Sequence, residues 1–556
     1  MGLNPAITSY LDYLRTLRTA HWQDVSTYRD YADGEQTAQL TSKQKEIITG
    51  STTKDPEFSL NVCSTTISAE VDRLHVKSLN VTANVGNAMT LEYAGRYEEL
   101  SDTLTKEAWR WWKQSRMDEG QINAFFSSCR DGDSYLITES VIDKATGKHA
   151  RPRIVVNQAM DADEEGVEIV YEDNSRTTPL YAVKEWTKQR PTKGNAAIGK
   201  VKRRNIYYSD RVEKYINEDA TSKYSGAMWQ PYMDDGDTAL ETVEDAQGNI
   251  YQAAVAWWTD TGAAGGSPLG IPVFHLPHDA RGGAYGRSAI ADIVPGLQDA
   301  INLSAVSLLA AAQLAGFKVA VVSGVNETVG KTLKLFPGAM IGLEDAEASA
   351  TQLAESDLRQ LIEVKDSYIK DAATITSTPL SFFNITGQIA AEGTLKQQES
   401  ALLAKVKRNQ ISFGNAIEDA VRMMLKLEVV YGDSLPLTID AIDDLDINCE
   451  WDSAETRNDR EVLDLTVIRH KELGTPREVA WSEAGYTQDE ITAMQTSTDT
   501  RRNVVMGQIT QMISTNEQQN DVEAQVQQQV QQQTGQKTQQ PVPNGATNGT
   551  ANASTN

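Results

Sequence analysis

Cysteine is scarce in this 556-residue chain, which carries only Cys63, Cys129 and Cys449, far apart in the sequence. An odd and sparse set does not form a disulfide framework, and no pair has the CxxC spacing of a metal or redox site. We therefore expect reduced thiols and a cytosolic setting.

Positive charge is also in short supply. The chain has 52 Lys and Arg residues against 77 Asp and Glu residues, which gives a formal net charge of -25. Affinity for nucleic acid comes from neutralised phosphates, so a protein that gripped DNA with its whole surface would be basic. The balance excludes a general DNA binder, but it allows a protein past which DNA slides.

Long apolar runs are absent as well. The most apolar stretch, Leu303 to Phe317, is interrupted by Ser304, Ser307 and Gln313, and it falls short of the ~20 residues that a membrane span needs. Met1 to Tyr13 has neither the basic nor the apolar region of a signal peptide. We expect a soluble protein with no membrane partner, built from roughly two to four domains.

Catalytic signatures are missing too. The six histidines include no HExxH pattern, and no GxSxG motif occurs. Gly324 to Thr332 resembles a phosphate-binding loop, but five residues separate its glycines where the P-loop has four, which favours a turn. His275 and His278 lie in an extended arm with no carboxylate pair placed to complete a metal site. The acidic runs Asp161 to Glu165 and Asp440 to Asp446 fit a solvated face better than a cation site. We predict no catalytic residues, no cofactor and no metal.

What the sequence does contain is clear periodicity. Apolar residues three to four apart predict helices, and alternation predicts strands between residues 134 and 258, which indicates an α+β fold class with a mainly antiparallel β region. The predicted helices are Pro5–Tyr31, Ser59–Leu74, Thr90–Met117, Glu119–Arg130, Leu395–Gly432, Asp459–Leu473, Pro476–Gly485 and Thr487–Gln495. The predicted strands are Val76–Val81, Tyr135–Thr138, Arg153–Val156, Val167–Tyr171, Leu180–Trp186, Arg204–Ser209, Val212–Tyr215, Gln252–Trp258 and Asp446–Glu450.

Composition adds three expectations. Two polar or acidic stretches of the β region, Lys188 to Lys202 and Glu218 to Gly248, are predicted to be inserted loops. The aromatic cluster Trp109 to Trp112 fits core packing better than a ligand cage. From Thr496 onward the chain is rich in Gln, Asn, Thr and Gly. We expect this tail to be largely disordered, because it has too little apolar surface to offset chain entropy.

The centre of the chain predicts a helical hairpin with a small module at its tip. A helix rich in small residues, Ile293 to Phe317, precedes a turn-rich insert with β character, Lys318 to Ala350. A second helix, Ser356 to Thr376, then returns, with Ser356 as its expected N-cap. An ordinary hairpin in one domain core explains the pairing, but small residues on most sides of the first helix suit a ring of neighbouring subunits better. Pro379 to Thr394, which follows, has no clear period.

Several motifs in a fixed order then point to a family. The strongest are Pro272-Val273-Phe274-His275, Gly286-Arg287-Ser288-Ala289-Ile290-Ala291-Asp292, Gln298-Asp299-Ala300-Ile301-Asn302 and Ala315-Gly316-Phe317. Together with Tyr28 to Gly34, Asn61 to Leu74 and Trp109 to Gly132, they resemble the portal proteins of tailed double-stranded DNA bacteriophages. The similarity is to the branch common in long-tailed phages of Gram-positive hosts, and it covers roughly residues 5 to 495.

The resemblance implies a ring of identical subunits, usually dodecameric, at one capsid vertex, through which double-stranded DNA is packaged and ejected. It implies as partners other copies of the chain, the major capsid protein, the terminase large subunit and head–tail adaptor proteins, while DNA passes without sequence-specific binding. The protein would be assembled in the host cytoplasm and reside in the virion. The implied parts are a wing (1–285), a first stem helix (286–317), a clip (318–352), a second stem helix (353–377), a tunnel loop (378–394), a wing helix and strand (395–455), a crown (456–495) and a Gln-rich tail (496–556).

A conduit must not hold DNA, so an acidic wall with a few mobile contacts suits the implied role. The candidates for such contacts are Lys331, Lys334, Lys370, Asn384, Thr386, Gln388 and Lys396. For each lysine, an ordinary surface position explains the residue at least as well. Two other functions stay open: a ring-forming head–tail adaptor, and a nucleotide-driven packaging motor subunit, against which the misspaced glycines argue.

Overall fold

The computed structural model divides the chain into two compact units, Met1–Arg457 and Asn458–Asn556. The structure describes residues 21, 23–35, 42, 45, 60–83, 97–143, 145–159, 165–172, 178–190, 199–217, 229–233, 239–244, 248, 250–283, 285–315, 320–323, 349–352, 358–383, 392–432, 435, 437–455, 459–486 and 490–491.

Helices open the first unit. Residues 23–33 are helical, and they are followed by α3 (Val62–Val71), α4 (Tyr97–Gln114) and α5 (Met117–Asp131). The N-cap of α3 is Asn61, whose side-chain oxygen accepts a hydrogen bond from the Ser64 N–H at 2.9 Å. Helix α5 ends at Gly132, whose φ of 96° lies in the left-handed region that glycine adopts readily.

The three tryptophans of α4 lie in the hydrophobic core. Trp111 and Trp112 are fully buried, and Trp109 is nearly so. The prediction that this aromatic cluster packs a core is therefore confirmed.

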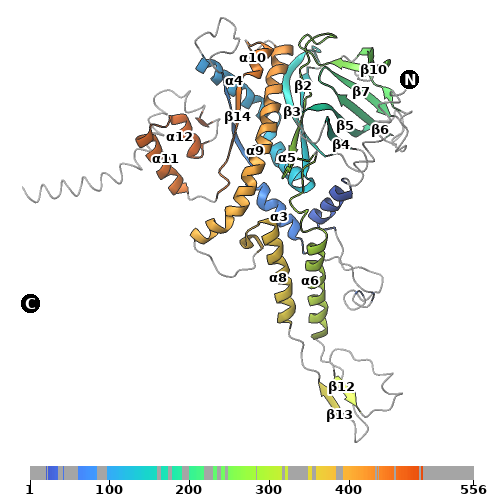
Figure 1. The fold of residues 1–556 in the computed structure, drawn as a ribbon, viewed down its shortest axis with the longest axis vertical. Helices are drawn as coiled ribbons and strands as arrows, with labels where there is room; N and C mark the ends of the chain where they lie inside the picture. The colour runs from blue at the N-terminus through green and yellow to red at the C-terminus, as the bar shows by residue number, and fades with distance from the viewer. Residues whose placement is uncertain are drawn as a thin grey trace, which may run out of the picture. The chain divides into compact units, whose positions relative to one another are not determined.

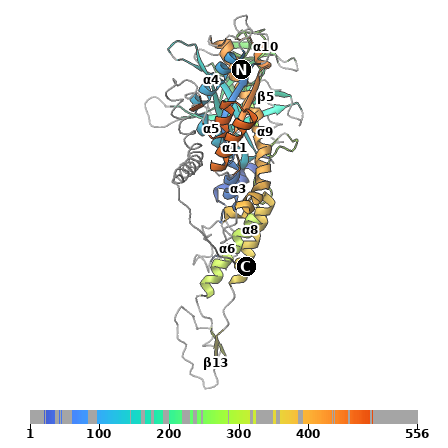
Figure 2. The same ribbon diagram turned by 90° about the vertical axis from the view of Figure 1, so that its left-hand side faces the viewer.

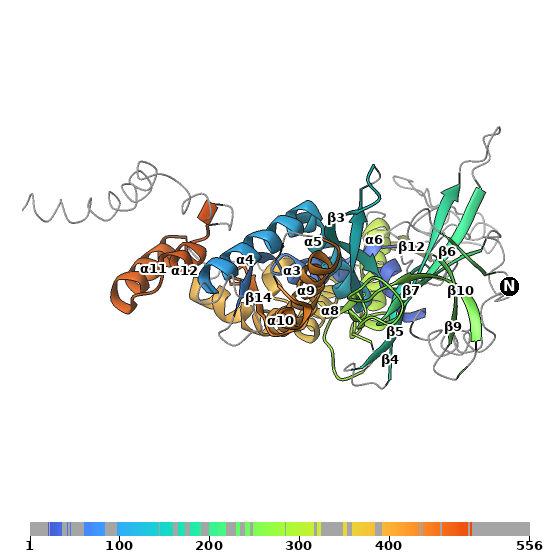
Figure 3. The ribbon, with the colours of Figure 1, turned by 90° about the horizontal axis from the view of Figure 1, so that it is seen from above.

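A three-stranded antiparallel sheet forms the middle of the first unit. Its strands lie in the order β11 (Val273–Pro277), β2 (Asp133–Ile142) and β3 (His149–Gln158). Helix α5 and the long helix α9 (Glu392–Tyr431) pack on one side, and a seven-stranded sheet covers the other (Figures 1 and 3). Strand β1 (Val76–Thr82) pairs separately with β14 (Asp446–Trp451), which joins the two ends of this unit.

The seven-stranded sheet is antiparallel throughout its named strands. It contains β4 (Gly166–Tyr171), β5 (Pro179–Arg190), β6 (Gly199–Tyr207), β7 (Arg211–Asn217), β10 (Ile250–Trp257) and β9 (Ala239–Glu244), in that order, with β8 (Gln230–Pro231) paired to β7. Two separate hydrophobic clusters lie on its faces, one around Tyr215 and one around Tyr207. A mixed α+β fold is confirmed.

Strands occupy parts of both predicted loop insertions. Strand β5 runs to Arg190 and β6 begins at Gly199, with Gln189 paired to Lys200, so strand structure covers both ends of Lys188 to Lys202. Within Glu218 to Gly248 the structure has β8 and β9. The polar residues indicated loops, but paired strands continue beyond the hydrophobic core, where their side chains are polar and their backbones remain hydrogen-bonded.

The predicted hairpin is present, but both of its helices begin later in the sequence than predicted. Residues 289–295 form turns, and α6 spans Gly296–Ala315, so it begins after Pro295 rather than at Ile293. Proline lacks an N–H and is placed well just before or in the first turn of a helix. The returning helix α8 spans Arg359–Thr376 with Leu358 at its N-cap position, and Ser356 lies outside the described residues.

The insert between the two helices begins and ends as a two-stranded ribbon. Strands β12 (Ala320–Ser323) and β13 (Ser349–Gln352) pair antiparallel. Residues 324–348, which include the glycine-rich stretch, Lys331 and Lys334, lie outside the described residues.

Beyond α8 the chain forms the short 3-10 helix η3 (Leu380–Phe383) and then α9. Six apolar residues with the helical spacing that predicts this helix are buried in α9: Leu402, Val406, Phe413, Ile417, Val421 and Leu425. A Cβ at Gly414 would lie 3.5 Å from the indole nitrogen of Trp451, an ordinary contact distance. Helix α10 (Ile439–Asp443) leads into β14.

The second unit contains α11 (Asp459–Leu473) and α12 (Arg477–Glu483). The predicted bounds of the first are confirmed, and those of the second agree within two residues. Residues 492–556, which include the Gln-rich tail, lie outside the described residues. In the described part of the chain, no helix combines the length and apolar character needed to cross a bilayer.

Candidate functional site

The candidate functional site is the α6/α8 hairpin with the segments that fix its base. Figures 1 and 2 show the two helices side by side, with β12 and β13 beyond the ends that point away from α3. Ile301, Ile369 and Ala372 are buried on the sides that face the core. Large apolar side chains on the other sides are between 39% and 50% exposed: Leu303, Leu309, Ile362, Val364 and Ile375.

The segment before α6 is held against the end of α5. The His278 N–H donates to the Gly132 carbonyl at 2.8 Å, and the Arg287 N–H donates to the His278 carbonyl at 2.8 Å. A Cβ at position 286 would lie 2.0 Å from the Gly132 oxygen. Only glycine fits at Gly286, which gives the physical reason for the first residue of the Gly286 to Asp292 motif.

Two buried amides of α6 satisfy the backbone at the start of α3. The Gln298 Nε2 donates to the Leu60 carbonyl at 2.7 Å, and its Oε1 accepts from the Val62 N–H at 3.2 Å. The Asn302 Oδ1 accepts from the Leu60 N–H at 3.0 Å. Both side chains are fully buried. The Gln298 to Asn302 motif is therefore a polar joint between two helices that are far apart in sequence.

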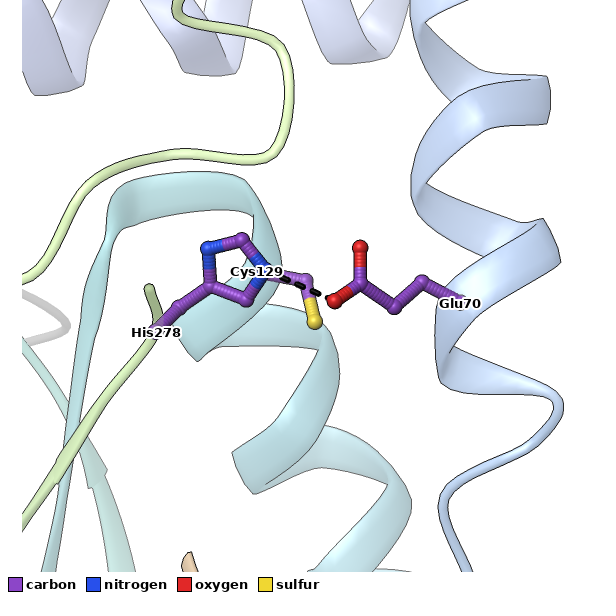
Figure 4. Close-up of side chains that lie close together, drawn as sticks. All are labelled: Glu70, Cys129 and His278. Atoms are coloured by element: carbon purple, nitrogen blue, oxygen red, sulfur yellow. Dashed lines mark hydrogen bonds and ion pairs between the residues drawn. The ribbon is translucent and has the colours of Figure 1, made fainter. Parts of the chain in front are cut away.

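A buried ionic centre ties the same base to α9. Glu70 of α3 is fully buried, and its Oε1 lies 2.8 Å from the His278 Nε2 (Figure 4). Its Oε2 lies 2.7 Å from the Lys405 Nζ, and the Asn409 side-chain amide also donates to Oε1. Burial alone would raise the pKa of Glu70, but His278 and then Lys405 outweigh it and lower that pKa to about 2. The carboxylate is thus charged at neutral pH and holds three segments together.

The same cluster does not fit a metal ion. Glu70, Cys129 and His278 place their ligand atoms within 4.8 Å of one another. However, the His278 Nδ1 faces the Arg287 carbonyl, which only accepts, while Nε2 faces the carboxylate. A ring that donates through both nitrogens has no lone pair for a metal. Burial, reinforced by Glu70, raises the pKa of the Cys129 thiol well above its ordinary value, so this sulfur stays protonated.

Each histidine of the extended arm has one buried carboxylate partner, an ion pair that the sequence did not predict. The His275 Nε2 lies 2.6 Å from the Asp133 Oδ1, in a pair separate from His278 and Glu70. Burial opposes ionisation of Asp133, but contacts with His21, His275 and the Gly286 N–H hold its pKa well below the usual range. The partners are 142 and 208 residues away in sequence, so no local spacing revealed them.

The structure describes the side chain of one of the seven predicted channel residues. Lys370 is an exposed residue of α8. Lys396 lies in α9, and its side chain is outside the described part. The others, Lys331, Lys334, Asn384, Thr386 and Gln388, lie outside the described residues altogether. Their contacts with DNA stay a prediction.

Sequence reasoning missed the polar residues that build the base. The apolar spacing predicted the helices that carry Glu70, Lys405 and Asn409. It did not indicate that these three side chains are largely buried, because charged and amide side chains on a helix are usually solvated. For Gln298 and Asn302 a signal did exist. Amides four residues apart within an otherwise apolar helical stripe indicate a buried hydrogen-bonded pair.

Comparison with known proteins identifies the class to which the chain belongs. A model of the family described as "Phage portal protein, SPP1 Gp6-like" matches residues 50–504. The chain belongs to this family of phage portal proteins, which confirms the resemblance inferred from its motifs.

Two curated relatives are similar to parts of the chain. The portal protein of Mycobacterium phage D29 is 26% identical over 217 residues, which cover 34% of this chain and 44% of the relative. The portal protein of Mycobacterium phage L5 is 26% identical over 232 residues, which cover 35% of this chain and 48% of the relative. The match therefore spans a little under half the length of each relative.

Proposed function

We propose that the chain is a portal subunit: a ring of its copies sits at the unique capsid vertex, and double-stranded DNA is packaged and ejected through that ring. In this proposal the ring docks the terminase motor during packaging and head–tail adaptors afterwards. It assembles in the host cytoplasm, becomes part of the virion beside the major capsid protein, and has no catalytic activity of its own.

The observation that carries the proposal is the incomplete burial of the α6/α8 hairpin. Five large apolar side chains remain between 39% and 50% exposed on two adjacent helices. Large apolar side chains left exposed on two adjacent helices favour an interface that a partner covers. The second unit, taken by itself, has the same property, with Leu465, Ile468 and Leu473 at least half exposed. A closed ring gives every copy the same neighbours and covers the same surfaces on each.

The parts implied by the family are assigned to the observed elements within this proposal. The stem is α6 and α8, the clip begins and ends with β12 and β13, and the tunnel loop includes η3. The wing comprises α3, α5 and α9 with the sheet of β1 and β14 and the three- and seven-stranded sheets, and the crown is α11 and α12.

The charge of the chain supports a conduit over a DNA-binding ring. A net charge of -25 repels the duplex, which carries about one negative charge per 1.7 Å of its axis, so DNA would not be retained along the wall. A ring-forming adaptor fits the apolar hairpin equally well. DNA packaging separates these two functions.

Electron microscopy of the purified full-length chain tests the proposal. We expect rings with an axial opening, and reconstituted packaging should require them. Monomers at micromolar concentration, or rings that package no DNA with the terminase, would overturn it. A packaging motor would instead show ATP hydrolysis by the purified chain alone.

A matched pair of variants tests the hairpin surface itself. Ile362→Asp places a charge on the exposed side of α8, where Ile362 is 41% exposed, and should abolish rings. Ile122→Asp makes the same change on α5, where Ile122 is 50% exposed, and should leave rings intact. Equal ring yields from both variants would contradict the role of the hairpin in assembly.

A further inference from the structure

Arg73, two residues beyond the end of α3, contacts η3, near the start of the proposed tunnel loop, and α9, which follows that loop. Its Nη2 donates to the Glu399 Oε1 of α9 at 3.3 Å. Its guanidinium carbon lies 5.0 Å from the centroid of the Phe382 ring in η3. Its Nη1 donates to the Ala69 carbonyl at 3.1 Å, which fixes the side chain to its own helix.

These contacts are largely shielded from water. The side chains of Arg73 and Glu399 are each 12% exposed. An ion pair in such a position is screened less by solvent and salt than a surface pair. The Arg73 Nε is buried and has no hydrogen-bond partner in the described part of the chain. Because a buried donor without a partner is unfavourable, the other contacts of the guanidinium must hold it there.

The two partners come from opposite sides of one stretch of chain. Phe382 belongs to η3, which follows α8, whereas Glu399 is eight residues into α9. The Arg73 side chain therefore connects the end of the segment formed by α8 and η3 to the beginning of α9, and it holds both against α3.

Arginine suits this joint better than lysine does. A guanidinium is planar, so it places its face on an aromatic ring while its edge donates to a carboxylate. A lysine ammonium keeps the charge but cannot present a face and an edge at once. The geometry thus requires the arginine itself rather than any cation.

We propose that Arg73 is a positioning residue that sets the separation between η3 and the start of α9, and through it the two ends of the loop that lines the channel. The inference rests on the proposed function for the role of that loop, but the positioning itself is a property of the single chain. It touches no DNA in this proposal.

Spin labels on the full-length chain measure the positioning directly. Ser381 and Gln397 are exposed residues close in sequence to Phe382 and Glu399. Spin labels on cysteines at these two positions therefore report the separation between η3 and the start of α9. Rings diluted with unlabelled chain keep the measurement within one subunit. Some molecules will show the wild-type distance between the two labels and others will show different distances. In Arg73→Met we expect the ratio of the first population to the second to fall roughly five- to tenfold. In Arg73→Lys this ratio should lie between those of the wild type and Arg73→Met, since lysine retains only the charge.

Controls separate this role from a general loss of stability. Arg153→Met removes an exposed ion pair with Glu139 on the β2/β3 hairpin and should leave the label distance unchanged. Exchanging the charges, Arg73→Glu with Glu399→Arg, should recover part of the wild-type distance, which a folding defect would not. An unchanged distance in Arg73→Met overturns the inference.

DNA packaging distinguishes the inference from the function on which it rests. We expect Arg73→Met to form rings in normal yield but to package or retain several-fold less DNA than Arg153→Met. A changed label distance with normal packaging overturns the link to the channel. Wild-type rings that package no DNA would instead overturn the proposed function, and the label distances would still decide the positioning role.

Discussion

The α6/α8 hairpin has a side that is complete within one chain and a side that is not. On the core side, Gln298 and Asn302 are fully buried and hydrogen-bonded to the start of α3. On the other side, Leu309 and Ile362 are about two-fifths exposed. The same two helices thus present one surface whose polar groups are satisfied and one whose apolar groups are not.

This difference separates what folds a subunit from what a ring would need. Buried hydrogen bonds and ion pairs are specific in geometry, so they fix the angle at which the hairpin leaves the core. Exposed apolar surface is less directional and becomes favourable once a neighbour covers it. Changes on the core side should therefore lower the stability of the single chain, whereas changes on the outer side should spare stability and affect assembly.

The largest effect on stability is expected at Gly286. In Gly286→Ala the new Cβ would meet the Gly132 carbonyl oxygen at 2.0 Å and the His278 backbone at 2.8 Å, so the backbone must move. We expect a loss of about 4 kcal/mol in the free energy of unfolding. Denaturant unfolding of the full chain measures it. Gly283→Ala is the matched control, because its Cβ would have 3.6 Å of clearance, and equal stabilities of the two variants would contradict the tight packing.

The next largest effect is expected at Glu70. Glu70→Gln leaves His278 and Lys405 without the buried carboxylate that balances them, which should cost about 3 kcal/mol. Asp292→Asn is the control, since its ion pair with Arg287 is much more exposed. Similar unfolding midpoints for the two variants would show that the buried centre adds nothing to stability.

The pH dependence of stability follows from the same carboxylate. The pKa of Glu70 is about 2 in the folded chain against an ordinary value of 4.5. Because the folded state binds this proton less readily, the stabilisation is fully present above pH 4.5 and is lost as the pH falls toward 2. Unfolding midpoints measured across that range should drop less steeply in Glu70→Gln than in the wild type. Parallel profiles would contradict the shift.

A smaller effect is expected at the amide joint. Gln298→Met keeps the length of the side chain but leaves the Leu60 carbonyl and the Val62 N–H without this partner, at a cost of about 2 kcal/mol. Ser304→Ala, on the same helix, removes only a bond from its hydroxyl to the Ala300 carbonyl and should stay within about 0.5 kcal/mol of the wild type. A Gln298→Met chain as stable as Ser304→Ala would break the contrast between the two sides of α6.

The sequence predicted local structure better than it predicted this contrast. Periodicity located the buried stripe of α9 and the bounds of α11, because both depend on spacing along one helix. It did not reveal that Glu70 meets His278 and Lys405, since such partners are set by the packing of distant segments. It also shortened β5 and β6, whose outer residues are polar but still paired. The family motifs were visible as strings, while the reason for them, such as the absence of space for a Cβ at Gly286, required the fold.

The smallest effect is expected at Lys370, the one predicted channel residue whose side chain the structure describes. It is exposed on α8, so Lys370→Gln should change the free energy of unfolding by less than about 0.5 kcal/mol and leave rings intact. If Lys370 meets passing phosphates, its loss should reduce the salt dependence of packaging by about one ion, because each neutralised phosphate releases roughly one counterion. Lys365→Gln is the control, since Lys365 pairs with Asp366 at 3.1 Å on the same helix. An identical salt dependence in both variants would assign Lys370 to the outer, subunit-facing side of the hairpin rather than to the channel.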